Sequence, residues 1–341
     1  MSVINRSRRR FLKAVTTTAS LFAGFSPFSV EASETMSVFR TQYRKASITD
    51  RPTDELCRRW KAAGMDGMEI RAWNSSLEEA RNMRKLVEKH GLRIHSVMRG
   101  WTEFHEPDQE KWEASIETMR VGLRTAAACG ANVLLFAPYE LKSLHWPSEP
   151  WLMDIDFDPK TLMIKTIMPG DNTPYAESIE KQNRATERAL QAIERLIPDA
   201  AKEGVILAIE NVRDNFWCTP KFFSAVIRSF NSIWVKAYYD FANHQRIANW
   251  VHWLDALNSE IVKIHVKEFH LKEVMGPLGG GPVSGGRIGG GSIDWRAARK
   301  KLDEINYNGW LTVEENERSI EEYAQILDQF VAGNDAGNEK P

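Results

Sequence analysis

Short apolar runs alternate with longer amphipathic segments along most of the chain, from about residue 36 onward. Short apolar runs are typical of buried strands, and apolar residues spaced three and four apart are typical of helices that cover a sheet. The predicted strands are 37–43, 67–72, 93–98, 132–137, 205–211, 235–241, 261–268 and 310–315. The predicted helices are 53–63, 76–90, 109–129, 174–203, 220–228, 245–257 and 295–305.

Boundary residues support this alternation of strands and helices. Thr219 and Pro220 are typical of the first residues of a helix. Four glycines stand just past predicted helices, where a left-handed residue is needed, and a predicted strand follows each within a few residues: Gly64, Gly91, Gly130 and Gly204. Repeated strand–helix units predict the α/β class and a (β/α)8 TIM barrel. An open doubly wound sheet is the alternative, but the Gly-rich turn expected after its first strand is missing.

Two connections are longer than usual for such a barrel. They cover residues 138–172 and 271–292, and the second contains the glycine triplets 279–281 and 289–291. Connections of this length more often form lids or binding elements than plain spacers. A phosphate-binding loop is not indicated, because the glycines are not followed by Lys and then Ser or Thr.

The N-terminal segment has the composition of an export signal. The sequence SRRRFLK at 7–13 precedes a mildly apolar run at 14–28 and a small-residue cleavage pattern ending at Ala32, which together resemble a twin-arginine signal. The apolar run is too short and too rich in Ser and Thr for a stable membrane span. We therefore expect residues 1–32 to be a signal peptide and 33–341 to be one barrel domain. The resemblance implies the twin-arginine export machinery as a partner and a periplasmic location; a basic helical start of a cytosolic protein is the alternative.

Composition excludes some partner and cofactor classes. The 45 Lys and Arg residues are balanced by 46 Asp and Glu residues, so the broad basic surface of a nucleic-acid-binding protein is not expected. Cys57, Cys129 and Cys218 show no spacing typical of a zinc site or a redox pair.

Polar residues stand at or near the ends of the last four predicted strands. They are Glu210, Asp240, His265 and Glu314. The carboxyl ends of barrel strands share one mouth, so these side chains are expected to converge. A lone acid at a strand end is more often a helix cap or an ion-pair partner. Four in succession favour a cation, because unpaired buried charges are costly, and the oxygen-rich set suits a hard divalent ion.

The segments around these residues carry a family resemblance. AIEN at 208–211, YYDFAN at 238–243, KIHVKE at 263–268 and TVEE at 312–315 resemble the metal-binding strands of the xylose-isomerase-like TIM-barrel superfamily, in particular its sugar isomerase/epimerase group with the ketose 3-epimerases. The likeness extends over most of residues 36–330, including GGGSIDW at 289–295. It implies that Glu210, Asp240, His265 and Glu314 bind one divalent ion, Mn²⁺ first, with Mg²⁺, Co²⁺ or Zn²⁺ as alternatives. It also implies that Glu210 and Glu314 are the catalytic acid and base.

Further residues are predicted to contact a substrate: Lys267, Arg287, Glu69, His95, Trp101 and Asn243. Lys267 follows His265 by two positions and so faces the same side of a strand. Arg287 lies where the family has a loop arginine, Glu69 and His95 are candidates to polarise a hydroxyl, and the indole of Trp101 can stack on a sugar.

The sequence departs from the ketose 3-epimerases at two positions. Phe216 stands where they have a further Glu, and Asn243 stands where they have a His.

The resemblance implies a divalent-metal-dependent sugar isomerase or epimerase that acts by proton abstraction and enediolate stabilisation. Export counts against a phosphorylated substrate, so a free sugar or a sugar derivative is expected. Two alternatives stay open: a keto-glycoside lyase or hydrolase that uses the same metal and glutamates, and a non-catalytic carbohydrate-binding barrel. Apurinic endonucleases share the fold but use several zinc ions and more histidines. The oligomeric state is open, and a homo-oligomer is compatible with the sequence.

Overall fold

The computed structural model describes residues 39–212, 215–269 and 288–334. Eight parallel strands close into a barrel in the order β1-β10-β9-β8-β7-β4-β3-β2. Their bounds are β1 Tyr43–Thr49, β2 Gly67–Ile70, β3 Arg93–Trp101, β4 Val133–Ala137, β7 Ile206–Glu210, β8 Val235–Asp240, β9 Ile261–Val266 and β10 Gly309–Val313. The predicted (β/α)8 barrel is confirmed.

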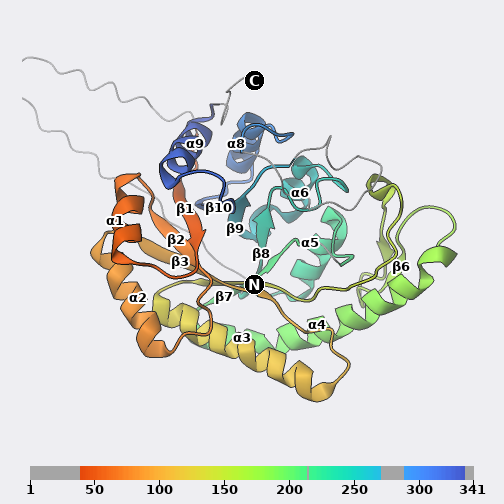
Figure 1. The fold of residues 1–341 in the computed structure, drawn as a ribbon. Helices are drawn as coiled ribbons and strands as arrows, with labels where there is room; N and C mark the ends of the chain where they lie inside the picture. Colours follow the sequence, from red (N-terminus) through yellow and green to blue (C-terminus); the bar gives the residue numbers. More distant parts are fainter. Residues whose placement is uncertain (1–38, 213–214, 270–287, 335–341) are drawn as a thin grey trace, which may run out of the picture. The chain divides into compact units, whose positions relative to one another are not determined.

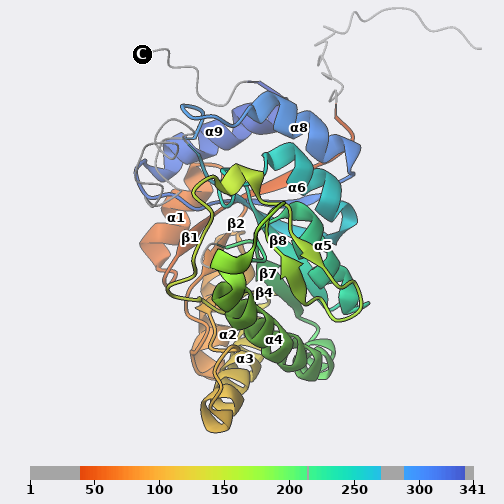
Figure 2. The ribbon, with the colours of Figure 1, turned by 90° about the vertical axis from the view of Figure 1, so that its right-hand side faces the viewer.

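The helices lie outside the ring of strands (Figure 1). They are α1 Asp54–Ala62, α2 Leu77–Lys89, α3 Gln109–Cys129, α4 Ala176–Glu203, α5 Pro220–Ser229, α6 Trp250–Leu257, α8 Trp295–Glu304 and α9 Ile320–Ala332. The long helices α3 and α4 run side by side (Figure 2), and Arg120 pairs with Asp199 between them at 2.8 Å. None of the helices in the described ranges is long and apolar enough to cross a membrane.

Two predicted elements differ from the structure, and one helix was missed. The first strand was expected at 37–43 but begins at Tyr43, because residues 43–47 are the ones that pair with β10. The helix expected from 245 begins at Trp250, after the Asn249 side chain accepts a hydrogen bond from Val251 N. Helix α9 was not predicted, although Ser319 and Glu322 form a capping box at its start.

The apolar side chains form two groups. Most pack between the strands and the surrounding helices, and a smaller set made by Val133, Leu135, Ala208 and Tyr238 packs separately. The Tyr238 hydroxyl lies 3.4 Å from Thr312 Oγ1 of β10, which is not a neighbour of β8, so this smaller set lies inside the barrel. The barrel is therefore a filled core rather than a pore.

The long connection 138–172 is built into the domain. It contains the antiparallel strands β5 Asp156–Phe157 and β6 Ile164–Thr166. The side chain of Asn183 in α4 bonds to both the N–H and the carbonyl of Ile164, at 2.7 and 2.9 Å. The connection thus docks on α4. Residues 270–287, which include most of the second long connection, lie outside the described residues.

Candidate metal centre

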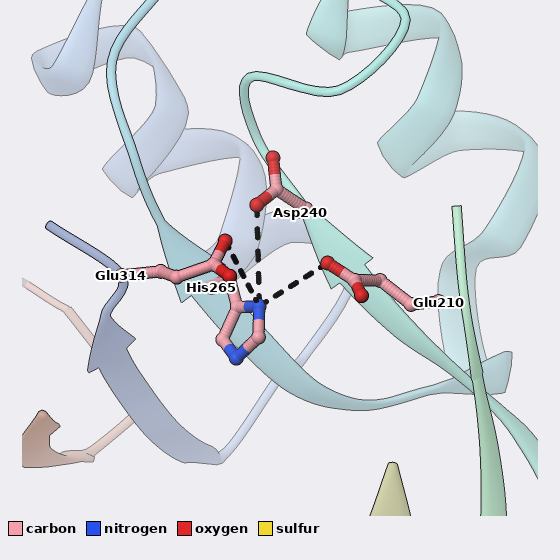
Figure 3. Close-up of side chains that lie close together, drawn as sticks. All are labelled: Glu210, Asp240, His265 and Glu314. Carbon is pink, nitrogen blue, oxygen red and sulfur yellow. Dashed lines mark hydrogen bonds and ion pairs between the residues drawn. The ribbon is translucent and has the colours of Figure 1, made fainter. Parts of the chain in front are cut away.

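Four side chains meet at the carboxyl ends of four neighbouring strands. Glu210, Asp240, His265 and Glu314 come from β7, β8, β9 and the residue after β10. Each offers one ligand atom, and these atoms all lie within 4.8 Å of one another. Figure 3 shows the three carboxyl groups turned toward one nitrogen of the imidazole. The convergence expected from the strand order is therefore present in the structure.

The imidazole nitrogen Nδ1 of His265 is the centre of this cluster. It lies 3.3 Å from Glu210 Oε1, 3.6 Å from Glu314 Oε2 and 3.9 Å from Asp240 Oδ2. Asp240 and His265 are fully buried, and Glu210 and Glu314 keep some exposure. The exposed part of the cluster is therefore contributed by its glutamates, mainly by Glu314.

A turn after β8 fixes the carboxyl group of Asp240. Its Oδ1 accepts hydrogen bonds from the backbone N–H of Ala242 at 2.7 Å and of Asn243 at 2.8 Å. Asn211 bonds to both the N–H and the carbonyl of Asp240, at 2.7 and 3.1 Å. These bonds leave Oδ2 directed at the cluster. Asn211 was not among the predicted site residues, although it follows Glu210 directly in the segment AIEN.

Lys267 lies beside two of the carboxylates. Its Nζ donates to Glu314 Oε2 at 2.8 Å and lies 3.8 Å from Asp240 Oδ2. Burial opposes its charge, but the charges of Asp240 and Glu314 raise the pKa of Lys267 above its ordinary value. Lys267 is therefore a fixed positive charge at the edge of the cluster.

The two glutamates differ in their acidity. Burial raises the pKa of Glu210 above its ordinary value, although His265 donates to it. Burial acts in the same sense on Glu314, but the positive charges of His265 and Lys267 lower the pKa of Glu314 to about 2. Opposite shifts in a pair of carboxyl groups are typical of acid–base pairs.

These residues fit a divalent cation. Three carboxylates and one imidazole are a ligand set for a hard or borderline ion. Asp240 Oδ2 is buried and accepts no hydrogen bond, which is costly unless a cation compensates it. Burial, followed by the opposing charge of Lys267 and the repulsion of Glu314 and Glu210, leaves the pKa of Asp240 at about 7. A bound cation would give Asp240 Oδ2 a partner and would also stabilise the charged form of the Asp240 carboxylate.

Two residues predicted to touch a substrate lie below the mouth instead. Glu69 is fully buried, and its Oε1 lies 2.9 Å from His265 Nε2. His95 is buried, bonds to Thr312 Oγ1 at 3.1 Å and stacks on Trp310 with ring centroids 4.3 Å apart. Both therefore contact protein groups in the barrel interior rather than the open side of the cluster.

The other predicted contact residues are placed as follows. Asn243 lies at the cluster, with Nδ2 3.4 Å from Glu210 Oε1. Trp101 is partly exposed at the carboxyl end of β3, on the mouth side. Arg287 lies outside the described residues. Phe216, which stands at the family's additional Glu position, is buried against Trp146 with ring centroids 5.0 Å apart.

Glu268 plays a structural role next to the cluster. Its Oε1 accepts from the N–H of Phe269 and of Ile293, and its Oε2 accepts from the N–H of Gly289 and from Trp295 Nε1. This buried carboxylate ties the segment before α8 to the end of β9. The position of the segment is therefore coupled to the strand that carries His265.

The fold of the chain matches several solved TIM-barrel structures, two of which are sugar epimerases. A 3-keto-D-glucoside 4-epimerase from E. coli is 15% identical, with 85% of this chain and 99% of that chain covered and a TM-score of 0.61. A D-psicose 3-epimerase is 14% identical, with 85% and 100% covered and a TM-score of 0.60. A xylose isomerase-like TIM barrel protein from Mycobacterium smegmatis in complex with magnesium is 15% identical, with 86% and 97% covered and a TM-score of 0.57.

Identities this low establish the fold alone. Among curated protein sequences, none matches this chain. The family model described as xylose isomerase-like TIM barrel matches residues 57–330, which is most of the sequence. The chain therefore belongs to the xylose isomerase-like TIM barrel family.

Proposed function

We propose that this protein is a divalent-metal-dependent epimerase or isomerase of a non-phosphorylated sugar or sugar derivative. The observation that carries the proposal is the placement of Glu210 and Glu314 on opposite sides of His265 (Figure 3). Two carboxyl groups that flank one substrate position can remove a proton from one face of a carbon and return it to the other. The epimerase activity of two structural neighbours supports a sugar as the substrate.

The ligands Glu210, Asp240, His265 and Glu314 would hold the cation. When bound, a divalent ion stabilises the negative charge that develops on substrate oxygens and so acidifies the adjacent C–H bond. Mn²⁺ is our first choice, and a neighbour crystallised with magnesium makes Mg²⁺ the next.

The two glutamates are the proposed proton-transfer pair. One carboxylate would remove the proton from the carbon, and the other would return it from the opposite side. Lys267 and Asn243 lie beside them and present N–H donors to a substrate oxygen.

Deuterium exchange tests this proposal. The Mn²⁺-loaded protein is incubated in D2O with free sugars, keto-sugars and keto-glycosides, and products are followed by NMR and mass. We expect deuterium at one carbon and a changed stereocentre or carbonyl position. Glu210→Gln and Glu314→Gln, each with Mn²⁺ still bound, should lower the rate at least about 100-fold.

Glu315→Gln is the matched control. Glu315 is the next residue along the chain, but its Oε1 accepts from Glu268 N at 3.2 Å instead of facing the imidazole. Full exchange in both test variants would refute the assignment of acid and base. A released aglycone would show a lyase, and sugar binding without any deuterium uptake would show a carbohydrate-binding barrel.

A further inference from the structure

Two ionisable side chains lie buried inside the barrel beneath the candidate metal centre. Glu69 is the third residue of β2 and is fully buried, and Lys263 is the third residue of β9 and is 3% exposed. Burial disfavours the charge on Lys263, and the opposite charge of Glu69 offsets part of that penalty. Burying ionisable side chains in a barrel core is costly, so their presence calls for a reason beyond packing.

The contact between Glu69 and His265 gives that reason. Glu69 Oε1 lies 2.9 Å from His265 Nε2, and both side chains are fully buried. The ring of Tyr238 packs on the imidazole with centroids 4.4 Å apart. The ring is thus held from below and from one side, and its other nitrogen, Nδ1, faces the three carboxylates.

The chemistry of imidazole then decides which nitrogen can bind a cation. A neutral imidazole has one N–H donor and one lone pair, and a carboxylate can only accept. When a cation binds Nδ1 in place of its proton, Glu69 holds the remaining proton on Nε2 and so leaves the lone pair of Nδ1 to the cation. Carboxylates that bind the far nitrogen of a metal-binding histidine orient the ring and strengthen its bond to the metal.

We propose that Glu69 is a positioning residue for the metal centre. It selects the tautomer and the orientation of His265 when a cation is bound. This assignment rests on the proposed metal site but not on the identity of the reaction. It replaces the substrate contact expected for Glu69 from the sequence, since the carboxyl group has no exposure.

Metal affinity gives the direct test. Mn²⁺ is titrated into the chelator-treated protein and followed by calorimetry, for the wild type, Glu69→Gln and Glu315→Gln. The amide of Glu69→Gln has nearly the same size but lacks the charge, so we expect Mn²⁺ to bind about 10- to 100-fold more weakly. Glu315→Gln removes a carboxylate beside the site that does not contact His265, and its affinity should stay within about twofold.

Kinetics separate positioning from substrate contact. A positioning role predicts that saturating Mn²⁺ restores most of the activity of Glu69→Gln, with KM for the sugar little changed. A substrate contact predicts a raised KM with an unchanged Mn²⁺ affinity, which would overturn the proposal. Weak Mn²⁺ binding by Glu69→Gln in a protein without sugar activity would refute the proposed function and leave the positioning role standing. No Mn²⁺ binding by the wild type would refute both.

Spectroscopy covers the case in which Glu69→Gln does not fold. In the wild type loaded with diamagnetic Mg²⁺, nitrogen-15 NMR of labelled histidine reports which ring nitrogen carries a proton. His265 is assigned by the signal that is missing from His265→Gln. We expect a slowly exchanging proton on Nε2 and none on Nδ1. A proton on Nδ1, or a metal bound to Nε2, would contradict the proposal.

Discussion

At the scale of single residues, Lys267 governs the charge of the candidate site. Its ammonium group lies 2.8 Å from Glu314 Oε2 and 3.8 Å from Asp240 Oδ2, so it contacts two of the four ligand groups. Without a cation, this lysine neutralises part of the carboxylate charge. With a cation, it competes for the same oxygens.

The variant Lys267→Met should therefore bind Mn²⁺ more tightly. Loss of a positive charge that lies 2.8 Å from Glu314 Oε2 and 3.8 Å from Asp240 Oδ2 favours a cation, and we expect at least about a tenfold gain in affinity by calorimetry. Turnover should fall, since the donor that we propose for a substrate oxygen is lost. Lys236→Met, which breaks the pair between Lys236 and Glu260 elsewhere on the barrel, should change neither quantity. Equal or weaker Mn²⁺ binding by Lys267→Met would contradict this picture.

His244 illustrates how burial sets a protonation state. It follows Asn243, which stands at the family's histidine position, but its own side chain is buried and Nε2 donates to the Val212 carbonyl. Burial lowers the pKa of His244 to about 4, although the bond to Val212 acts in the opposite direction. His244 is therefore a neutral core residue near the site, stacked on Trp253.

The depressed pKa of His244 predicts a loss of stability in acid. The unfolded chain takes up this proton at its ordinary value of about 6.5, whereas the folded protein resists protonation until about pH 4. The stabilisation is thus complete above the unfolded value and falls as the pH drops toward 4. Between pH 7 and 5, the wild type should lose about 2 kcal/mol more than His244→Asn, measured by urea unfolding. Asn tolerates the positive φ of this position, and parallel pH curves would argue against the assignment.

At the scale of elements, close packing of strands places the buried Glu69. A Cβ on Gly67, the first residue of β2, would lie 2.2 Å from the Arg93 carbonyl oxygen in β3 and 2.7 Å from the Trp310 ring. Glycine is required there because neither neighbour can move without shifting a strand. The register of β2, and with it the contact between Glu69 and His265, depends on this glycine.

Gly67→Ala should consequently lower the free energy of unfolding by about 3 kcal/mol, since the added carbon overpacks a rigid site. Gly204→Ala is the matched control. Gly204 ends α4 with φ +66, and nothing lies within 4 Å of an added Cβ, so we expect a cost of about 1 kcal/mol from backbone strain alone. Chemical unfolding measures the loss of unfolding free energy in both variants. Equal losses would show that the strands around Gly67 adjust freely.

At the scale of the whole molecule, residues 1–32 are expected to direct export of the folded protein. This expectation concerns residues outside the described ranges. Replacement of both Arg8 and Arg9 by Lys should keep the protein in the cytoplasm, because twin-arginine export reads that pair. Cell fractionation with antibody detection measures the outcome. Arg10→Lys changes the variable position between the pair and Phe11 and should leave export intact; retention of this variant as well would point to a different signal.

Much of the fold was predictable because the barrel repeats one local pattern. The spacing of apolar residues and the residues at the boundaries located helices such as α3, whose predicted and observed bounds agree. Gly130 ends α3 in the left-handed conformation, as expected. The first strand was misplaced because Arg44 and Lys45 interrupt its apolar pattern. Lys45 is tolerated since its Nζ reaches Asp328 at the surface.

The sequence by itself determined the alternation of strands and helices and the four polar strand ends, because periodicity and strand direction are local properties of the chain. Only the tertiary structure decided which role each buried polar group has. Glu69 in β2 and His95 in β3 stand before the carboxyl ends of their strands. Their hydrogen-bond partners, His265 and Thr312, are far away in the sequence. Which atoms meet inside a closed barrel depends on strand register and tilt, and these are set by packing across the whole ring.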